Sequence, residues 1–227
     1  MENNLQRPVT ILSRVLAYID ALEVSPGEVY FPALAQALVE RYGFQKFPQT
    51  LEEFDLSKGI EFLSGVSNGV GIGKFVIWPN ILVLETRVST DASKEILESI
   101  LVWATEKFSL RYVPGDIKRF AYISDVTFNS DESLLIFDPV LNWLSHQVSD
   151  ALTEIWQEPV EYLPTSLKIG HDPVLRQAGI APFSIERRGT ARFSENKYFS
   201  EAPLPTDLHI KLLDEFEAMV HLKAKEL

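Results

Sequence analysis

Three short apolar runs separated by turn signals, within residues 59–88, constrain the fold of this chain most. The runs are rich in Ile, Val, Phe and Trp, and they are interrupted at Asn68-Gly69 and Pro79-Asn80. Asn-Gly is the dipeptide most typical of a two-residue hairpin turn. The pattern predicts three consecutive antiparallel strands. A further strand is expected over Arg119–Phe128, where apolar residues alternate.

Helical periodicity predicts five helices around these strands. The first two are expected to form an N-terminal helical hairpin, because the Ser25-Pro26-Gly27 breaker separates them. The apolar side of the fourth helix is expected to point inward. The expected helices are Val9–Glu23, Phe31–Tyr42, Asp91–Phe108, one from Pro139 to about Glu158, and one that begins after Thr206-Asp207.

The order of these elements predicts an α+β fold with a predominantly antiparallel sheet, because helices and strands do not alternate as in a parallel α/β protein. We expect a single domain over residues 1–227, with residues 1–45 either part of it or a helical appendage at the N-terminus. Strands are also expected near Tyr162–Ile169 and Phe183–Phe193, joined by an irregular stretch that contains glycine and proline.

The composition excludes several classes of protein. There is no cysteine, so disulfides, thiolate nucleophiles and iron–sulfur ligation are absent, which is typical of a reducing compartment. No run approaches the roughly 18 consecutive apolar residues that a membrane span requires. We therefore expect a cytoplasmic protein without a membrane anchor.

A reversal of charge distinguishes one segment from the rest of the chain. The chain has a net charge of −11, which argues against broad binding to duplex nucleic acid. Residues 168–197 are instead net positive, which predicts an anionic ligand or an acidic partner. The basic residues of this segment are Lys168, Arg176, Arg187, Arg188, Arg192 and Lys197, against the acidic residues Asp172, Glu186 and Glu195.

Three arginines are the candidate ligand-binding residues. On a regular strand Arg188 and Arg192 share one face and Arg187 points away, so two guanidinium groups can engage one phosphate or carboxylate. Gly189 between them favours a bulge that shifts this register. The alternative is that these arginines pair across strands with the protein's own abundant Asp and Glu.

The candidates for catalysis are weaker. Ser67 lies in a G-x-S-x-G match to the nucleophile elbow, but an elbow needs a helix after the serine, and the sequence predicts a hairpin there. His171 is the first choice for an acid or base, with Asp172 beside it, because it lies in a predicted loop within the basic segment. Glu195 and Lys197 have the acid-x-Lys spacing that metal-dependent nucleases place on a strand.

No metal site and no cofactor are predicted, because the four histidines have no tight metal-ligand spacing. The leading hypothesis is a noncatalytic cytoplasmic binding or assembly subunit. Its basic strand region is expected to contact an acidic or anionic partner, either another protein or a second copy of the chain. The alternative is an enzyme or sensor for a nucleotide or phosphodiester with an arginine-lined anion site. A serine hydrolase centred on Ser67 is a third hypothesis.

Overall fold

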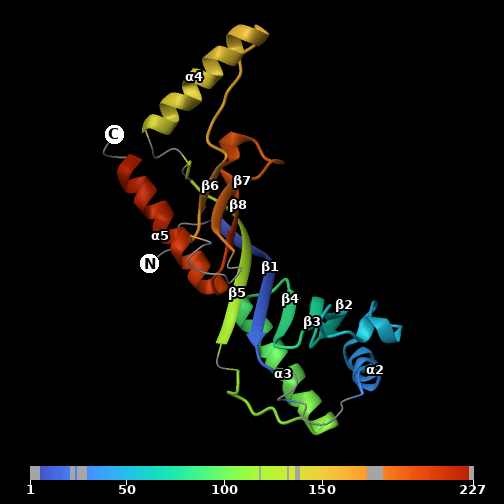
Figure 1. The fold of residues 1–227 in the computed structure, drawn as a ribbon. Helices are drawn as coiled ribbons and strands as arrows, with labels where there is room; N and C mark the ends of the chain where they lie inside the picture. Colours follow the sequence, from blue (N-terminus) through green and yellow to red (C-terminus); the bar gives the residue numbers. More distant parts are fainter. Residues whose placement is uncertain are drawn as a thin grey trace. The chain divides into compact units, whose positions relative to one another are not determined.

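The computed structural model describes residues 6–20, 24, 30–117, 119–131, 133–135, 139–172 and 181–224. It has an α+β fold, which confirms the predicted class (Figure 1). The strands are β1 (Gln6–Tyr18), β2 (Ile60–Ser67), β3 (Val70–Ile77), β4 (Ile81–Thr86), β5 (Arg119–Asn129), β6 (Ser166–Ile169), β7 (Phe183–Arg187) and β8 (Lys197–Ala202); the α-helices are α2 (Phe31–Tyr42), α3 (Thr90–Phe108), α4 (Pro139–Trp156) and α5 (Thr206–Ala224).

The strands form a large antiparallel sheet in the hydrogen-bonded order β2-β3-β4-β1-β5-β8-β7-β6. The chain divides into two compact units. Unit 1 comprises Met1–Val9, Val126–Ala202 and Leu208–Leu227, and unit 2 comprises Thr10–Asp125 and Pro203–Asp207.

The predicted N-terminal helical hairpin is wrong, and so is the count of five helices, because Gln6–Tyr18 forms strand β1. Its residues pair in antiparallel register with β4, for example Val15 with Leu84. The apolar residues of this segment fit a helical stripe, but its β-branched residues and the free edge of β4 favour a strand. Tertiary pairing therefore decides the structure of a segment whose local pattern is ambiguous. The described part of the chain contains four α-helices.

The three-stranded meander of unit 2 is confirmed. Strand β2 pairs with β3 and β3 with β4, both antiparallel. Asn68 and Gly69 connect the first two strands with φ values of 48° and 81°, the left-handed backbone that a tight hairpin turn requires. Gly65 in β2 is needed for another reason, because a Cβ atom there would lie 2.6 Å from the Phe44 ring.

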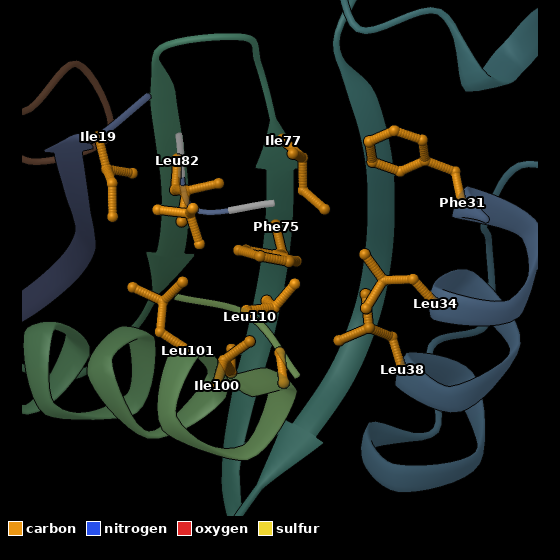
Figure 2. Close-up of a pocket in the computed structure, with 12 residues that line it drawn as sticks. Ile19, Phe31, Leu34, Leu38, Phe75, Ile77, Leu82, Ile100, Leu101 and Leu110 are labelled. Atoms are coloured by element: carbon orange, nitrogen blue, oxygen red, sulfur yellow. The ribbon is translucent and has the colours of Figure 1, made fainter. Parts of the chain in front are cut away.

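Helices α2 and α3 pack against one face of this sheet. Leu38 of α2, Leu97 of α3 and the strand residues Phe62 and Leu84 are fully buried in one apolar core. A cavity of about 80 Å³ remains between the helices and β3 and β4 (Figure 2). Its lining is apolar throughout, so it lacks the polar partners that an ordered water needs.

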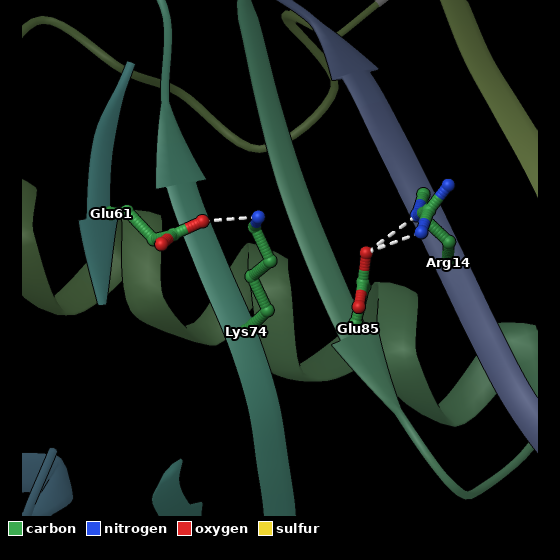
Figure 3. A network of polar contacts seen from close by, with 4 residues as sticks. All are labelled: Arg14, Glu61, Lys74 and Glu85. Carbon is green, nitrogen blue, oxygen red and sulfur yellow. Dashed lines mark hydrogen bonds and ion pairs between the residues drawn. The ribbon is translucent and has the colours of Figure 1, made fainter. Parts of the chain in front are cut away.

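The other face of the unit 2 sheet carries charged side chains in a row across the strands. Arg14 of β1 pairs with Glu85 of β4 at 2.6 Å, and Lys74 of β3 pairs with Glu61 of β2 (Figure 3). These ion pairs are partly exposed, so each contributes little to the free energy of unfolding.

In unit 1, helix α5 packs against strands β5, β7 and β8. Ile185 and Tyr198 of the strands are buried with Leu213 of the helix, and Phe128 stacks on Tyr198. This apolar cluster fixes the strands that carry the basic segment.

Helix α4 forms where the sequence predicts it, but its apolar side does not point inward. Leu144 and Ile155 are 50% and 70% exposed, and Trp143 is 60% exposed. The prediction of a buried apolar side is therefore wrong. Along the described residues, none of the helices has the length and apolar composition that crossing a bilayer requires.

Candidate anion-binding surface

The basic segment does not form one long strand. Strand β7 ends at Arg187, and the chain then turns, with the Ala191 N–H donating a hydrogen bond to the Arg188 carbonyl at 3.0 Å. Arg192 follows this turn and precedes η2, a short 3-10 helix over Phe193–Glu195. The prediction that Arg188 and Arg192 share a face of one strand is therefore wrong. A register shift at the intervening glycine was expected, but the structure has a complete turn.

Arg187 points to the inner side of β7 and is held by the protein itself. Its guanidinium donates hydrogen bonds to Ser133 Oγ at 2.6 Å, to the Phe193 carbonyl at 3.0 Å and to the Pro164 carbonyl at 3.2 Å. The same group lies 5.5 Å from the centre of the Tyr198 ring. These contacts tie three separate segments together. Arg187 was predicted as a ligand-binding residue, but its guanidinium group makes hydrogen bonds within the protein and holds these segments together.

Arg188 and Lys197 lie directly opposite each other where the β7–β8 ladder ends. The Arg188 N–H donates to the Lys197 carbonyl at 2.9 Å, which continues the register set by Arg187 and Tyr198. The Arg188 guanidinium lies 5.4 Å from the centre of the Phe199 ring. Like charges opposite each other in an antiparallel pair are destabilising unless an anion offsets them. The two side chains thus form a pair of cations at one end of the ladder.

The described cations of the basic segment have one property in common, because none of them forms an ion pair with a described residue. Within the described residues, neither Arg188, Arg192 nor Lys197 forms an ion pair, and Lys168 forms none either. In the unit 2 sheet, Arg14 and Lys74 are each paired with a glutamate, as Figure 3 shows, whereas Arg119 of β5 lies over the Tyr18 ring and forms no ion pair with a described residue. The predicted alternative, in which the arginines pair with the protein's own acids, is not observed there.

We name Arg188, Arg192 and Lys197, together with Phe199, the basic surface. Arg188 and Lys197 are half-buried, and Arg192 is exposed. Stacking on Phe199 restricts the Arg188 side chain, so its planar fork loses less entropy when it binds an oxyanion. The surface can therefore hold carboxylate or phosphate groups.

Glu195 does not form the predicted acid-x-Lys arrangement on a strand. It lies in η2, and its carboxylate accepts a hydrogen bond from the Arg192 N–H at 3.0 Å. Lys197 begins β8, so the two residues do not alternate along one extended backbone. The part of the chain that the structure describes contains no group of three His, Asp or Glu side chains arranged to hold a metal ion.

His171 and Asp172 are exposed and follow β6 after Gly170. Arg176, the remaining basic residue of the segment, lies outside the described residues. Neither His171 nor Asp172 is part of the basic surface.

Ser67 lies at the last position of β2 and is paired with Val70, the first residue of β3. A nucleophile elbow needs a strand, a sharp turn and a helix, whereas a second strand follows here. The G-x-S-x-G match is part of the hairpin, as the turn chemistry of Asn68-Gly69 predicts.

The structure contains a Ser–His pair that the sequence did not predict. Ser200 Oγ and His209 Nε2 lie 2.8 Å apart, and both residues are fully buried. The Ser200 hydroxyl donates its only proton to the Ser184 carbonyl at 2.7 Å, so the His209 Nε2–H must be the donor in the other bond. A base that activates a nucleophile has to accept that proton instead. The pair therefore stabilises unit 1 and is not a catalytic dyad.

No protein-family model matches the chain, and the comparison with curated proteins gave no match in sequence.

Proposed function

We propose that this protein is a noncatalytic cytoplasmic binding or assembly subunit that contacts an acidic or anionic partner through the basic surface. The observation that carries the proposal is the juxtaposition of Arg188 and Lys197 without a carboxylate on either. Two cations on opposite residues of a β-ladder, neither in an ion pair, are stabilised when a partner supplies negative charge.

The wider charge distribution supports a specific contact. The chain is strongly acidic in total, so an acidic partner is repelled everywhere except where cations gather. Such a contrast favours one binding orientation and makes association sensitive to salt. The cytoplasmic location rests on the absence of cysteine.

The test uses a charge reversal on the basic surface. The variant Arg188→Glu with Lys197→Glu is compared with a control in which Lys58→Glu and Lys211→Glu make the same change in net charge. Both control lysines are highly exposed, at 75% and 69% of their side chains. The probe is fluorescein-labelled polyglutamate, and the readout is fluorescence anisotropy.

We expect the wild type and the control to bind the probe, more weakly as salt is added. The Arg188/Lys197 variant should bind at least about tenfold more weakly, equivalent to roughly 1.4 kcal/mol. Equal binding by the two variants would contradict the proposal, because total charge and not the basic surface would then determine affinity.

A second candidate is a sensor or enzyme for a nucleotide or phosphodiester. The stacking of Arg188 on Phe199, beside Lys197, favours it, because aromatic rings and cations together recognise nucleotides. Isothermal titration with ATP tests it. Binding of ATP that the reversal at Arg188 and Lys197 abolishes, without binding of polyglutamate, would support this candidate over the first.

A further inference from the structure

The apolar cavity of unit 2 is buried at one end and reaches the surface at the other. Its inner wall is formed by buried side chains of strands β3 and β4 and helices α2 and α3, among them Leu38, Phe75 and Leu82 (Figure 2). At the other end, which we call the rim, the lining residues are only half-buried, so the cavity is accessible there. The rim residues are Ile19, Val24, Phe31 and Leu110.

The cavity leaves part of the unit 2 core unfilled. Protein interiors contain few voids larger than a water molecule, and an empty cavity destabilises a fold in proportion to its volume. The volume of about 80 Å³ exceeds that of a single water, and the apolar lining offers water no hydrogen-bond partner. An apolar group inside the cavity would supply the missing van der Waals contacts. The cavity is therefore suited to an apolar ligand.

The size of the cavity restricts the shape of that ligand. A dry cavity of about 150 Å³ with a similar lining of Leu, Ile and Phe accepts benzene. The cavity of unit 2 has about half that volume, which is too small for such a ring but suits the end of an unbranched hydrocarbon chain. The remaining methylene groups of the chain can lie against the apolar rim. We therefore expect an elongated ligand with one end buried.

A cation lies beside the rim. Arg111 directly follows Leu110, and its N–H donates a hydrogen bond to the Val24 carbonyl at 2.8 Å, so two rim residues hold it there. Arg111 is exposed and forms no ion pair with a described residue. A guanidinium group is suited to bidentate contact with a carboxylate. A chain that enters the cavity and carries a carboxylate at its outer end matches both features.

We propose that the cavity of unit 2 binds the hydrocarbon end of a fatty acid, whose carboxylate lies at the rim beside Arg111. This site is separate from the basic surface, which belongs to unit 1, and it does not depend on the proposed function. The competing explanations are a cavity that binds nothing and a site for hydrocarbon chains of any head group.

A titration with octanoate, followed by NMR of protein with ¹³C-labelled methyl groups, tests the site. Burial of each methylene group tightens binding about fourfold, so hexanoate should bind roughly 15-fold more weakly than octanoate. Acetate has the carboxylate without the chain and should not bind to the cavity. The absence of saturable shifts with octanoate, or equal affinities for octanoate and hexanoate, would overturn the proposal.

Ala104→Leu fills the cavity from within. Ala104 is a buried residue of α3 that lines the cavity, and leucine is also a good helix former. The variant should fold with a melting temperature at or above that of wild type and bind octanoate at least about tenfold more weakly, because the ligand and the new side chain compete for one space. Octanoate binding of wild-type strength by the folded variant would overturn the proposal.

The rim charges test the head group. Arg111→Gln should weaken octanoate binding about two- to fivefold, the range of an exposed ion pair, and leave octanol binding unchanged. Asp20→Asn is the matched control, because it removes the acid that follows Ile19 at the same rim and should not weaken octanoate binding. The variant Arg188→Glu with Lys197→Glu should bind octanoate as wild type does. Unchanged octanoate binding in Arg111→Gln would overturn the assignment to a carboxylate.

Intermolecular nuclear Overhauser effects locate the chain in the wild-type protein without any substitution. The terminal methyl group of octanoate should give contacts to the methyl groups of Leu38, Leu82 and Ile100, which line the cavity (Figure 2). Contacts mainly to exposed apolar residues such as Leu144 of α4 would indicate nonspecific binding and overturn the proposal.

Discussion

Arg187 and Arg188 are neighbours in sequence with different roles, so the conservative change to lysine should affect them differently. In Arg187→Lys the ammonium group can keep one of the three hydrogen bonds to Ser133, Phe193 and Pro164. A hydrogen bond to a charged group contributes about 1.5–3 kcal/mol, and the lower value applies to this partly buried site, so losing two bonds costs about 3 kcal/mol. For a chain of this size that lowers the melting temperature by about 6–12 °C.

Urea denaturation followed by circular dichroism measures this change, with Arg188→Lys as the control. Arg188 makes no side-chain hydrogen bond or ion pair within the described residues, so its substitution should change the free energy of unfolding by no more than about 0.5 kcal/mol. Similar losses in the two variants, or no loss in Arg187→Lys, would refute the structural role of Arg187.

Three further outcomes are expected. Burial raises the pKa of the Glu217 carboxyl, although a hydrogen bond from Ser130 opposes this. Protonation of this carboxyl therefore favours the folded state, and that contribution to the free energy of unfolding is lost as pH rises through the folded-state pKa. Glu217→Gln should therefore gain stability over wild type as pH increases in urea titrations, and a gain that does not vary with pH would refute this. Gly65→Ala should cost about 1–3 kcal/mol, because the new methyl group meets the Phe44 ring, and an unchanged urea midpoint would contradict that packing. A fluorophosphonate probe should not label Ser67, and stoichiometric labelling seen by mass spectrometry would restore the hydrolase hypothesis.

The local signals in the sequence predicted most elements correctly. The Asn68-Gly69 turn is encoded by two adjacent residues, so it can be predicted without knowledge of tertiary contacts. Strand β1 was not predicted because its pattern of apolar residues fits both a helix and a strand. Only its pairing with β4 decides between the two. The exposure of α4 was missed for a related reason, since an apolar stripe does not show whether its own chain or a partner covers it.

The candidate site was only partly predictable. The charge reversal located the basic segment, but the opposition of Arg188 and Lys197 depends on the register between β7 and β8, which composition does not contain. Arg187 is the last residue of β7 and Arg188 follows it, so these adjacent arginines lie on opposite sides of the end of the β7–β8 ladder. The Arg187 partners Ser133 and Pro164 are 54 and 23 residues away in sequence, and no local pattern connects them.

We propose that an acidic partner binds at the basic surface. The most direct measurement is a titration of ¹⁵N-labelled protein with polyglutamate, followed by heteronuclear NMR. We expect the largest shifts at the amides of the basic surface, and we expect them to disappear in the Arg188→Glu, Lys197→Glu variant. These amides are those of Arg188, Arg192, Lys197 and Phe199. Shifts that cluster elsewhere, or that persist in that variant, would contradict this proposal.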